Sequence, residues 1–222
     1  MSDIFDEISE DLRAERAHHL MRRYGALLAG MAVLAILGVG AYQGWKYYQQ
    51  QQTMRQADSF LAAMHIADGA DGAQRQTALP AFAKLAQDGN AGYRTLSRLR
   101  EAALKAAGGD GAGAAALWNE ISADTKADPL LRDLASLEWA MHQIDAGDPA
   151  AVQARLAPLA AANNPWHALA QEQQALLALR QGHKDAARDI LKRLGQDVTA
   201  PDGVRGRANG LLAELGSPAG GS

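Results

Sequence analysis

A spacing of seven, five and four residues recurs three times in the chain, and it constrains the fold more than any other feature. Each copy places a small residue in a first helix, a glycine in a turn, a small residue in a second helix and a bulky residue one turn later. Two helices that cross closely and hold a large side chain between repeats require this order. The copies, one with valine at the third position, are Ala102, Gly109, Ala114 and Trp118, then Ala140, Gly147, Val152 and Leu156, then Ala175, Gly182, Ala187 and Leu191. The spacing therefore predicts stacked helix hairpins.

The rest of residues 53–215 also predicts helices. Alanine and leucine recur at helical spacing, β-branched residues are few, and no segment alternates apolar with polar residues as a half-buried strand would. Breaks rich in glycine or proline separate segments of about 12 to 18 residues, the length of helices that pair as antiparallel hairpins. The breaks lie near residues 69–73, 89–92, 108–113, 127–129, 147–149, 163–165, 182 and 200–203. The expected fold is all-α.

Three helix starts have a local cause in the sequence. Asp128, Asp148 and Asn164 each stand directly before a proline. A side-chain oxygen then occupies the N-cap, and the proline occupies the first helical position, where its missing N–H has no cost. We therefore expect helices to begin at the three prolines.

The spacing resembles that of the tetratricopeptide repeat, whose period is near 34 residues and whose glycine, alanine and phenylalanine-or-leucine positions it matches. Pro129, Pro165 and Pro201 follow one another at intervals of 36 residues. The tryptophan and tyrosine positions of the repeat are mostly absent, Val152 stands where alanine is expected, and residues 53–91 fit loosely. The resemblance implies an α-solenoid of antiparallel hairpins in which the first helices line a concave surface that binds peptides or partner segments.

An uncharged segment near the N-terminus predicts a single membrane span. The 18 residues from Gly25 to Tyr42 carry no charge, and as a helix they would extend roughly 27 Å, close to the thickness of a bilayer's hydrocarbon core. Arginines are more frequent before this segment than after it, which favours a cytoplasmic N-terminus. The predicted layout is a cytoplasmic tail over 1–23, a transmembrane helix over 24–45, a stalk over 46–56, a periplasmic helical domain over 57–215 and a disordered tail over 216–222.

A cleaved secretory signal is the alternative interpretation of this segment. Six acidic residues precede it, and the bulky sequence YQGWKYYQQQQ follows it where a cleavage site would need small residues. We therefore favour a retained span. Within it, Gly40 and Gly44 form a Gly-x-x-x-Gly pair, which allows a second membrane helix to approach closely. The ordinary glycine content of membrane helices is the alternative explanation of the pair.

Composition and motifs argue against catalysis, a metal site, a cofactor and nucleic-acid binding. Residues 53–222 carry 17 Lys or Arg and 19 Asp or Glu, and the chain has no cysteine. The histidines show neither His-x-x-x-His nor His-Glu-x-x-His spacing, and the sequence has no nucleophile elbow and no phosphate-binding loop after a strand. We expect a protein that is not an enzyme.

One polar stripe is a candidate for protein binding. Arg94, Arg98, Glu101 and Lys105 are three or four residues apart, so they share one face of a helix. In tetratricopeptide arrays, a first helix such as this one lines the concave surface. A hydrated face with an internal ion pair is the alternative, because charged helix faces are common.

The whole layout resembles a bacterial inner-membrane family that includes the ancillary subunit of the Sec translocon, in its alphaproteobacterial form. The resemblance rests on MSDIFDEISEDLRAERA, RRYGALLAGMAVLAILGVGAYQGWKYYQQQQ and NPWHALAQEQQALLALRQGHKDAARDIL. It implies a non-enzymatic adaptor in the inner membrane that links Sec translocon subunits to periplasmic chaperones or exported chains. A self-associating protein of the cell envelope or division machinery is the alternative, and homo-oligomer formation is left open.

Overall fold

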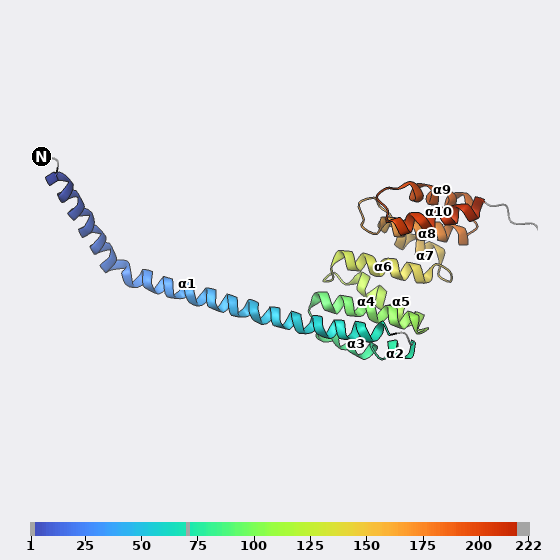
Figure 1. Cartoon of the computed structure of the whole chain (residues 1–222), viewed down its shortest axis with the longest axis horizontal. Coiled ribbons are helices and arrows are strands. Elements are labelled where there is room, and N and C mark those ends of the chain that lie inside the picture. Colours follow the sequence, from blue (N-terminus) through green and yellow to red (C-terminus); the bar gives the residue numbers. More distant parts are fainter. Residues whose placement is uncertain (1–2, 70–71, 217–222) are drawn as a thin grey trace, which may run out of the picture. The chain divides into compact units, whose positions relative to one another are not determined.

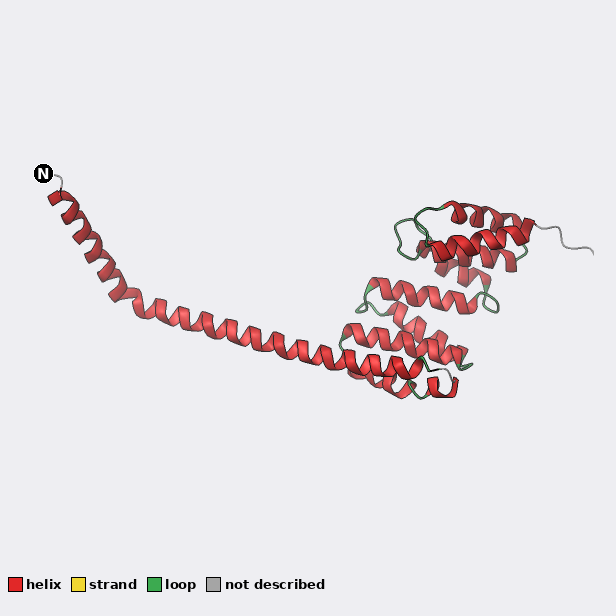
Figure 2. Cartoon of the chain, viewed as in Figure 1, coloured by secondary structure: helices red, strands yellow, loops and turns green. Residues whose placement is uncertain are grey.

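The computed structural model of the chain describes residues 3–69 and 72–216, with the side chains of 27, 29–31, 33–69, 72 and 75–216. In these ranges the backbone forms helices and connecting loops, and no strand (Figures 1 and 2). The all-α fold predicted from the sequence is therefore confirmed for the described residues. The helices are α1 (Asp3–Ala67), α2 (Gly72–Gln76), α3 (Leu79–Asp88), α4 (Ala91–Ala107), α5 (Gly111–Ala123), α6 (Pro129–Gln143), α7 (Pro149–Leu159), α8 (His167–Arg180), α9 (Lys184–Gln196) and α10 (Asp202–Gly216).

The chain divides into two compact units, Met1–Arg55 and Gln56–Ser222, with the boundary inside α1. In the first unit, large apolar and aromatic side chains are exposed along the helix. Among the described residues, no helix is both long enough and apolar enough to cross a membrane, in contrast to the span predicted over 24–45. The side chains of residues 24–26, 28 and 32 of that predicted span lie outside the described ones. The exposed side chains are Leu27, Met31, Val33, Leu34, Ile36, Leu37, Val39, Tyr42, Trp45, Tyr47, Tyr48 and Met54.

The other predicted segment boundaries stay predictions. The first helix covers the described parts of the predicted tail, span and stalk, and α10 reaches Gly216. Residues 217–222, most of the predicted disordered tail, lie outside the described residues.

The second unit is a series of helix hairpins in which each helix packs against the next. The hairpins are α4 with α5, α6 with α7 and α8 with α9, and α10 ends the series by packing on α9 (Figure 1). At the other end, the last turns of α1 pack against α3 and α4, where Phe60 and Phe82 meet edge to face with their ring centroids 5.6 Å apart. Four apolar clusters follow one another along the series, and each is shared by neighbouring hairpins.

The first helices of successive hairpins lie closer together than the second helices. α4 contacts α6, α6 contacts α8, and α8 contacts α10, whereas among the described residues α5, α7 and α9 make no comparable contacts with one another. In a stack of hairpins, the helices that approach each other lie on the inner side of the curve. The even-numbered helices from α4 to α10 therefore form what we call the inner surface.

The repeated spacing predicted from the sequence marks the packing positions of this unit. All nine of its non-glycine residues are 1% exposed or less, as is expected where two helices cross closely. Two of its three glycines, Gly109 and Gly182, have φ of 88° and 79°, a left-handed conformation that glycine adopts without steric cost. At the third, Gly147, a Cβ would lie 2.7 Å from the backbone oxygen of Gln143. Backbone conformation therefore explains glycine at two of the three positions, and a close backbone contact explains it at the third.

Replacing Gly109 by alanine is expected to lower the free energy of unfolding by about 1–2 kcal/mol, because an L-residue is strained at positive φ. Gly111 is the matched control. It begins α5, its φ is not positive, and nothing lies within 4 Å of an added Cβ, so Gly111→Ala should be neutral or slightly stabilising. Urea denaturation of the full chain followed by circular dichroism measures both. An equal effect of the two substitutions would contradict the conformational argument.

Two of the three predicted helix starts are confirmed, and the third is wrong. Asp128 and Asp148 are N-caps whose carboxylates accept hydrogen bonds from backbone N–H groups of the first turn. The third helix, α8, begins at His167 rather than at Pro165. The Asn164 side chain accepts a hydrogen bond from the Trp166 backbone N–H and donates one to Asp133 Oδ2, both at 2.8 Å. Asn164 therefore stabilises a turn before the helix and ties that turn to α6.

Side-chain hydrogen bonds join each hairpin to the preceding one. Trp166 Nε1 donates to the backbone oxygen of Leu130 at 3.1 Å, 36 residues earlier. Arg155 Nη2 donates to Asn119 Oδ1 at 2.7 Å, also 36 residues earlier, and its guanidinium lies 4.4 Å from the ring centroid of Trp139. Such bonds fix the rotation of one hairpin relative to the next, because they can form in one relative orientation only.

Candidate protein-interaction surface

The polar stripe predicted on α4 contacts other parts of its own hairpin. Arg98 is central to it: its side chain is 18% exposed, and its guanidinium lies 2.8 Å from Glu120 Oε2 and 3.4 Å from Asp124 Oδ2 of the α5 region. Lys105 Nζ lies 3.3 Å from Asp110 Oδ2 in the turn between α4 and α5. These two cations are thus paired with acidic residues of the same hairpin. This arrangement corresponds to the alternative interpretation of the stripe, a hydrated helix face with an internal ion pair.

The two remaining residues of the stripe differ in their contacts. Arg94 Nη2 donates to the backbone oxygen of Gly89 at 3.1 Å, just before α4. Glu101 is partly exposed on α4. Protein binding by Arg94, Arg98, Glu101 and Lys105 stays a prediction, since the structure contains no partner. The described contacts of Arg98 and Lys105 stabilise the hairpin.

Asp110 shows how this hairpin is stabilised. Its carboxylate accepts a hydrogen bond from the Gly113 backbone N–H at 2.9 Å and caps α5. This bond, and then the neighbouring Lys105, hold the pKa of the Asp110 carboxyl below its usual value. The Asp110 side chain is 52% exposed, so we assign the effect to local capping.

A cavity of about 350 Å³ opens on the inner surface between α8 and α10. Its lining combines apolar with charged side chains, and none of the lining residues belongs to the stripe on α4. The lining residues are Glu172, Leu176, Arg207, Gly210, Leu211 and Glu214.

An ion pair between a buried glutamate and a half-exposed arginine forms one wall of this cavity. The side chain of Glu172 on α8 is only 5% exposed, and its two carboxylate oxygens lie 2.5 and 2.6 Å from Nε and Nη2 of Arg207 on α10. The hydrogen bond to Glu172 raises the pKa of Arg207. A buried carboxylate is tolerated only when a partner satisfies it, so this pair also fixes α10 against α8.

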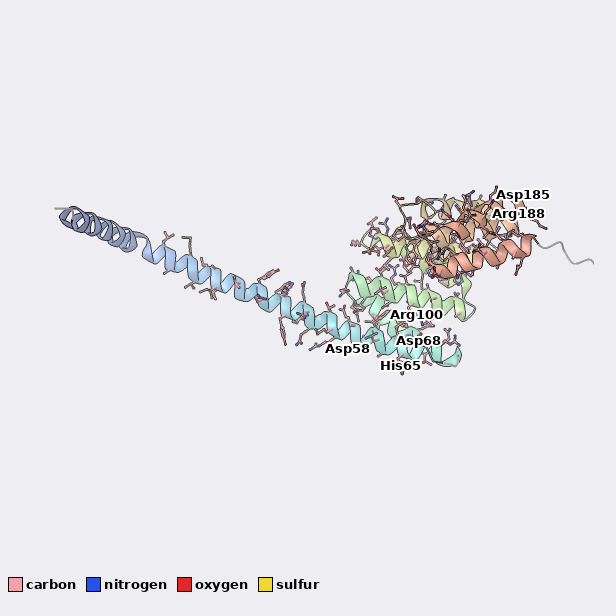
Figure 3. All side chains as sticks on the ribbon, turned by 45° about the horizontal axis from the view of Figure 1, so that its top comes forward. Asp58, His65, Asp68, Arg100, Asp185 and Arg188 are labelled. Atoms are coloured by element: carbon pink, nitrogen blue, oxygen red, sulfur yellow. The ribbon has the colours of Figure 1, made fainter. Side chains whose placement is uncertain are left out.

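A second cavity, of about 420 Å³, opens beside α4 and includes Arg100, Ala103 and Ala107 in its lining. Arg100 Nη2 lies 2.6 Å from Asp68 Oδ1, and Figure 3 shows these two side chains next to one another. The charge of Arg100 is therefore paired, as that of Arg207 is.

Glu138 on α6 is a partly buried carboxylate that forms no ion pair with another described residue, as are Glu101 on α4 and Asp133 on α6. Burial raises the pKa of its carboxyl, and the charge of His142 one turn later partly opposes this. A raised pKa in the folded state means that the protonated form is favoured by folding. The ionised carboxylate therefore costs stability above the folded-state pKa, and this cost disappears below the unfolded value.

Glu138→Gln is accordingly expected to raise the Tm of the full chain by about 1–3 °C near neutral pH. The difference from the parent chain should vanish as the pH is lowered to about 4, where the carboxyl of the parent is protonated as well. Thermal denaturation across this pH range tests it, with the 97% exposed Asp185 replaced by Asn as a control. A lower Tm for the variant at neutral pH would show that ionised Glu138 is stabilised by its surroundings.

Two further predictions from the sequence concern the glycine pair of α1 and the binding of metal ions. At Gly40 and Gly44, nothing lies within 4 Å of an added Cβ, and close packing with a second helix stays a prediction. In the part of the chain with described side chains, no group of three His, Cys, Asp or Glu is placed to hold a metal ion.

Comparison with known proteins gives one match. The family model of the tetratricopeptide repeat-like domain matches residues 18–198, which include all three copies of the repeated spacing and the helices α2 to α9. No curated protein matches the chain. No solved structure matches it either. Since the family model covers most of the sequence, the chain belongs to the tetratricopeptide repeat-like domain family.

Proposed function

We propose that this protein is a membrane-anchored scaffold that binds other proteins on the inner surface of its repeat and links the Sec translocon to periplasmic chaperones or exported chains. The observation that carries the binding role is the row of even-numbered helices, with an open cavity between α8 and α10. Tetratricopeptide repeat-like domains act by binding proteins, and they are typically not catalytic. The link to the translocon rests on the resemblance of the sequence.

The proposed anchor is the segment 24–45. Its described apolar side chains lie on every side of the helix, because Val33, Leu34 and Val39 point in three directions about 100° or more apart at 3.6 residues per turn. A helix that is apolar all round needs an apolar environment. Aromatic residues at 42–48 suit the headgroup region that would follow.

Anchoring would serve the function without any chemistry. A binding surface held near a membrane meets partners at the same membrane at a high effective concentration, so weak contacts become sufficient. We therefore expect partner binding to fall sharply when the segment 24–45 is removed, even though the inner surface is unchanged.

Site-specific photo-crosslinking of the full chain in living cells tests the proposal. A crosslinker at Met141, which is 37% exposed on α6, should capture translocon subunits, periplasmic chaperones or exported chains. The same crosslinker at Asp185 on α9 is the matched control and should capture none of them. Alkaline extraction of membranes and protease treatment of spheroplasts should show a chain that stays in the membrane with its C-terminal domain accessible.

Three outcomes would contradict the proposal in different ways. Release of the chain from membranes by alkali would contradict the proposed membrane anchor. Equal crosslinking of partner proteins from Met141 and Asp185 would contradict the inner surface as the binding site. Crosslinks from Met141 to a second copy of the chain alone would favour the self-associating envelope protein instead.

A further inference from the structure

One side of α1 carries a row of residues at alternating intervals of four and three. The helix runs without a break through residues 33–54, inside the first unit (Figure 2). At about 100° per residue, the row stays within an arc of roughly 100° along this length. This is the heptad spacing with which one helix packs along another. What we call the α1 row consists of Val33, Leu37, Gly40, Gly44, Tyr47, Gln51 and Met54.

Met54 distinguishes this row from the other sides of the helix. In residues 46–56, the segment predicted as a stalk, Met54 is the only aliphatic residue, and its side chain is 56% exposed. It lies seven residues after Tyr47, so the α1 row stays apolar beyond the proposed anchor. The neighbouring row through Tyr48 reaches Arg55 instead, a charge that would oppose its own copy in a symmetric pair of helices.

Gly40 and Gly44 lie in the middle of the α1 row. Nothing lies within 4 Å of a Cβ added at either position, so no packing within the described chain requires a glycine there. Glycine weakens a helix interior relative to alanine. Two glycines four residues apart allow the backbone of a second helix to approach closely. The large residues of the row, Val33 and Leu37 before the pair and Tyr47 and Met54 after it, are each more than half exposed.

Tyr47 and Gln51 favour a second copy of the chain as the partner. Gln51 Nε2 donates to the Tyr47 hydroxyl oxygen at 2.8 Å. The hydroxyl can still donate its own proton, and the amide keeps its carbonyl oxygen as an acceptor. In a two-fold pair of parallel helices, Tyr47 of each copy can donate to Gln51 of the other, so that the same contact occurs twice. A helix with the same two groups at the same height satisfies both.

Charge does not oppose this pairing. Lys46 is the only charged residue in 33–54, and its position lies about 120° around the helix from the middle of the row at Tyr47 and Gln51. We propose that two copies of the chain pair in parallel along the α1 row, as a left-handed coil of two helices. The inference rests on the proposed function for the membrane anchor, which holds two copies parallel and at the same depth. The pair carries two inner surfaces, so its binding to partners is bivalent.

Cysteine crosslinking of the full chain in cell membranes tests this pair, because the chain has no cysteine of its own. Two forms with different affinity tags are expressed together, each with one introduced cysteine, and the membranes are oxidised with copper phenanthroline. Gln51→Cys should give at least about fivefold more product with both tags than Gln49→Cys, because a disulfide needs Cα atoms within about 7 Å. Both glutamines are exposed, and Gln49 lies on the opposite side of the helix from the row.

A second matched pair and the glycines extend the test. Tyr47→Cys should crosslink more than Tyr42→Cys, although the two tyrosines are 65% and 67% exposed, because only Tyr47 belongs to the row. Replacing both glycines of the row by isoleucine should reduce the product of Met54→Cys about tenfold. Gly38→Ile is the matched control: nothing lies within 4 Å of its added Cβ, and it lies off the row, so it should change the product by less than about twofold.

Equal crosslinking from positions on and off the row would overturn the proposal, as would the absence of any product with both tags. Products with other proteins alone would show that a different helix occupies the row. An unchanged Met54→Cys product in the isoleucine variant would also overturn the close pairing. Alkaline extraction measures the anchor separately, and partner crosslinks from Met141 are measured on α6. A chain that stays in the membrane and keeps those crosslinks without pairing would leave the proposed function standing.

Discussion

Replacing Trp118 by alanine is expected to lower the free energy of unfolding by about 3–5 kcal/mol, the range for deleting a large aromatic side chain from a core. Trp118 on α5 is 1% exposed and lies in the cluster that joins the first repeated hairpin to α6. Its ring centroid is 4.4 Å from that of His142. The substitution would therefore open a cavity at the junction of two hairpins. Urea denaturation of the full chain, followed by circular dichroism, measures the loss.

Two controls separate this cavity from a general sensitivity of the fold. Trp118→Phe should cost clearly less than Trp118→Ala, because it keeps much of the volume and removes an indole N–H that is buried without a hydrogen-bond partner among the described residues. Val198→Ala, at a side chain that is 84% exposed, should change stability by less than about 0.5 kcal/mol. If Trp118→Ala cost no more than Trp118→Phe, the junction would not depend on the ring.

Arg207→Ala is expected to lower the free energy of unfolding by about 2–4 kcal/mol. Removing one partner of a buried pair costs more, about 3–5 kcal/mol, but Arg207 itself is 55% exposed and water can reach the site. The loss arises because the nearly buried carboxylate of Glu172 would remain without its two hydrogen bonds. The measurement is the Tm of the variant and parent chains at matched pH values.

The matched variant replaces both partners by apolar residues of similar size, Glu172→Leu with Arg207→Met. This double variant should recover most of the loss of Arg207→Ala, because no unpaired charge remains between α8 and α10. Arg205→Ala is a surface control: Arg205 pairs with the exposed Asp202 within α10, and its loss should cost less than about 1 kcal/mol. A double variant as unstable as Arg207→Ala would mean that the packing of the arginine stem, rather than the charge, is what stabilises the contact.

Much of the hairpin architecture could be predicted, because its causes are local. Ala140, Gly147 and Leu156 occupy their places through spacing along one hairpin, and helix periodicity converts that spacing directly into a shared face. The capping aspartates Asp128 and Asp148 act on N–H groups two or three residues away. Local causes of this kind can be recognised without knowledge of the tertiary structure.

One error occurs where a contact to another hairpin competes with a local preference, and a second has a local cause. Asn164 was expected to cap a helix at Pro165, but its amide donates to Asp133 of the preceding hairpin, and the helix begins later. The break between α2 and α3 was also missed. Pro80 lies in the first turn of α3, a position that proline accepts without interrupting a helix, so the sequence there signals a helix more clearly than the break before it.

The candidate site was harder to predict than the fold. A charged stripe such as Arg94, Arg98 and Lys105 has the same spacing whether it faces a partner or the acids of its own hairpin. The Glu172 and Arg207 pair is separated by 35 residues, and no pattern within either helix marks the two as partners. Such pairs follow from the rotation of one hairpin on the next, which the repeat period alone leaves open.

The sequence by itself determined that the described second unit consists of helices, where most of them begin and end, and which small and bulky residues meet inside each hairpin. These properties depend on backbone preferences and on spacing over at most two helices. Only the tertiary structure decided which charges are paired, which carboxylates remain without a cation, and where a cavity opens between α8 and α10. Those outcomes depend on side chains about 35 residues apart, whose energies are set by how the hairpins stack.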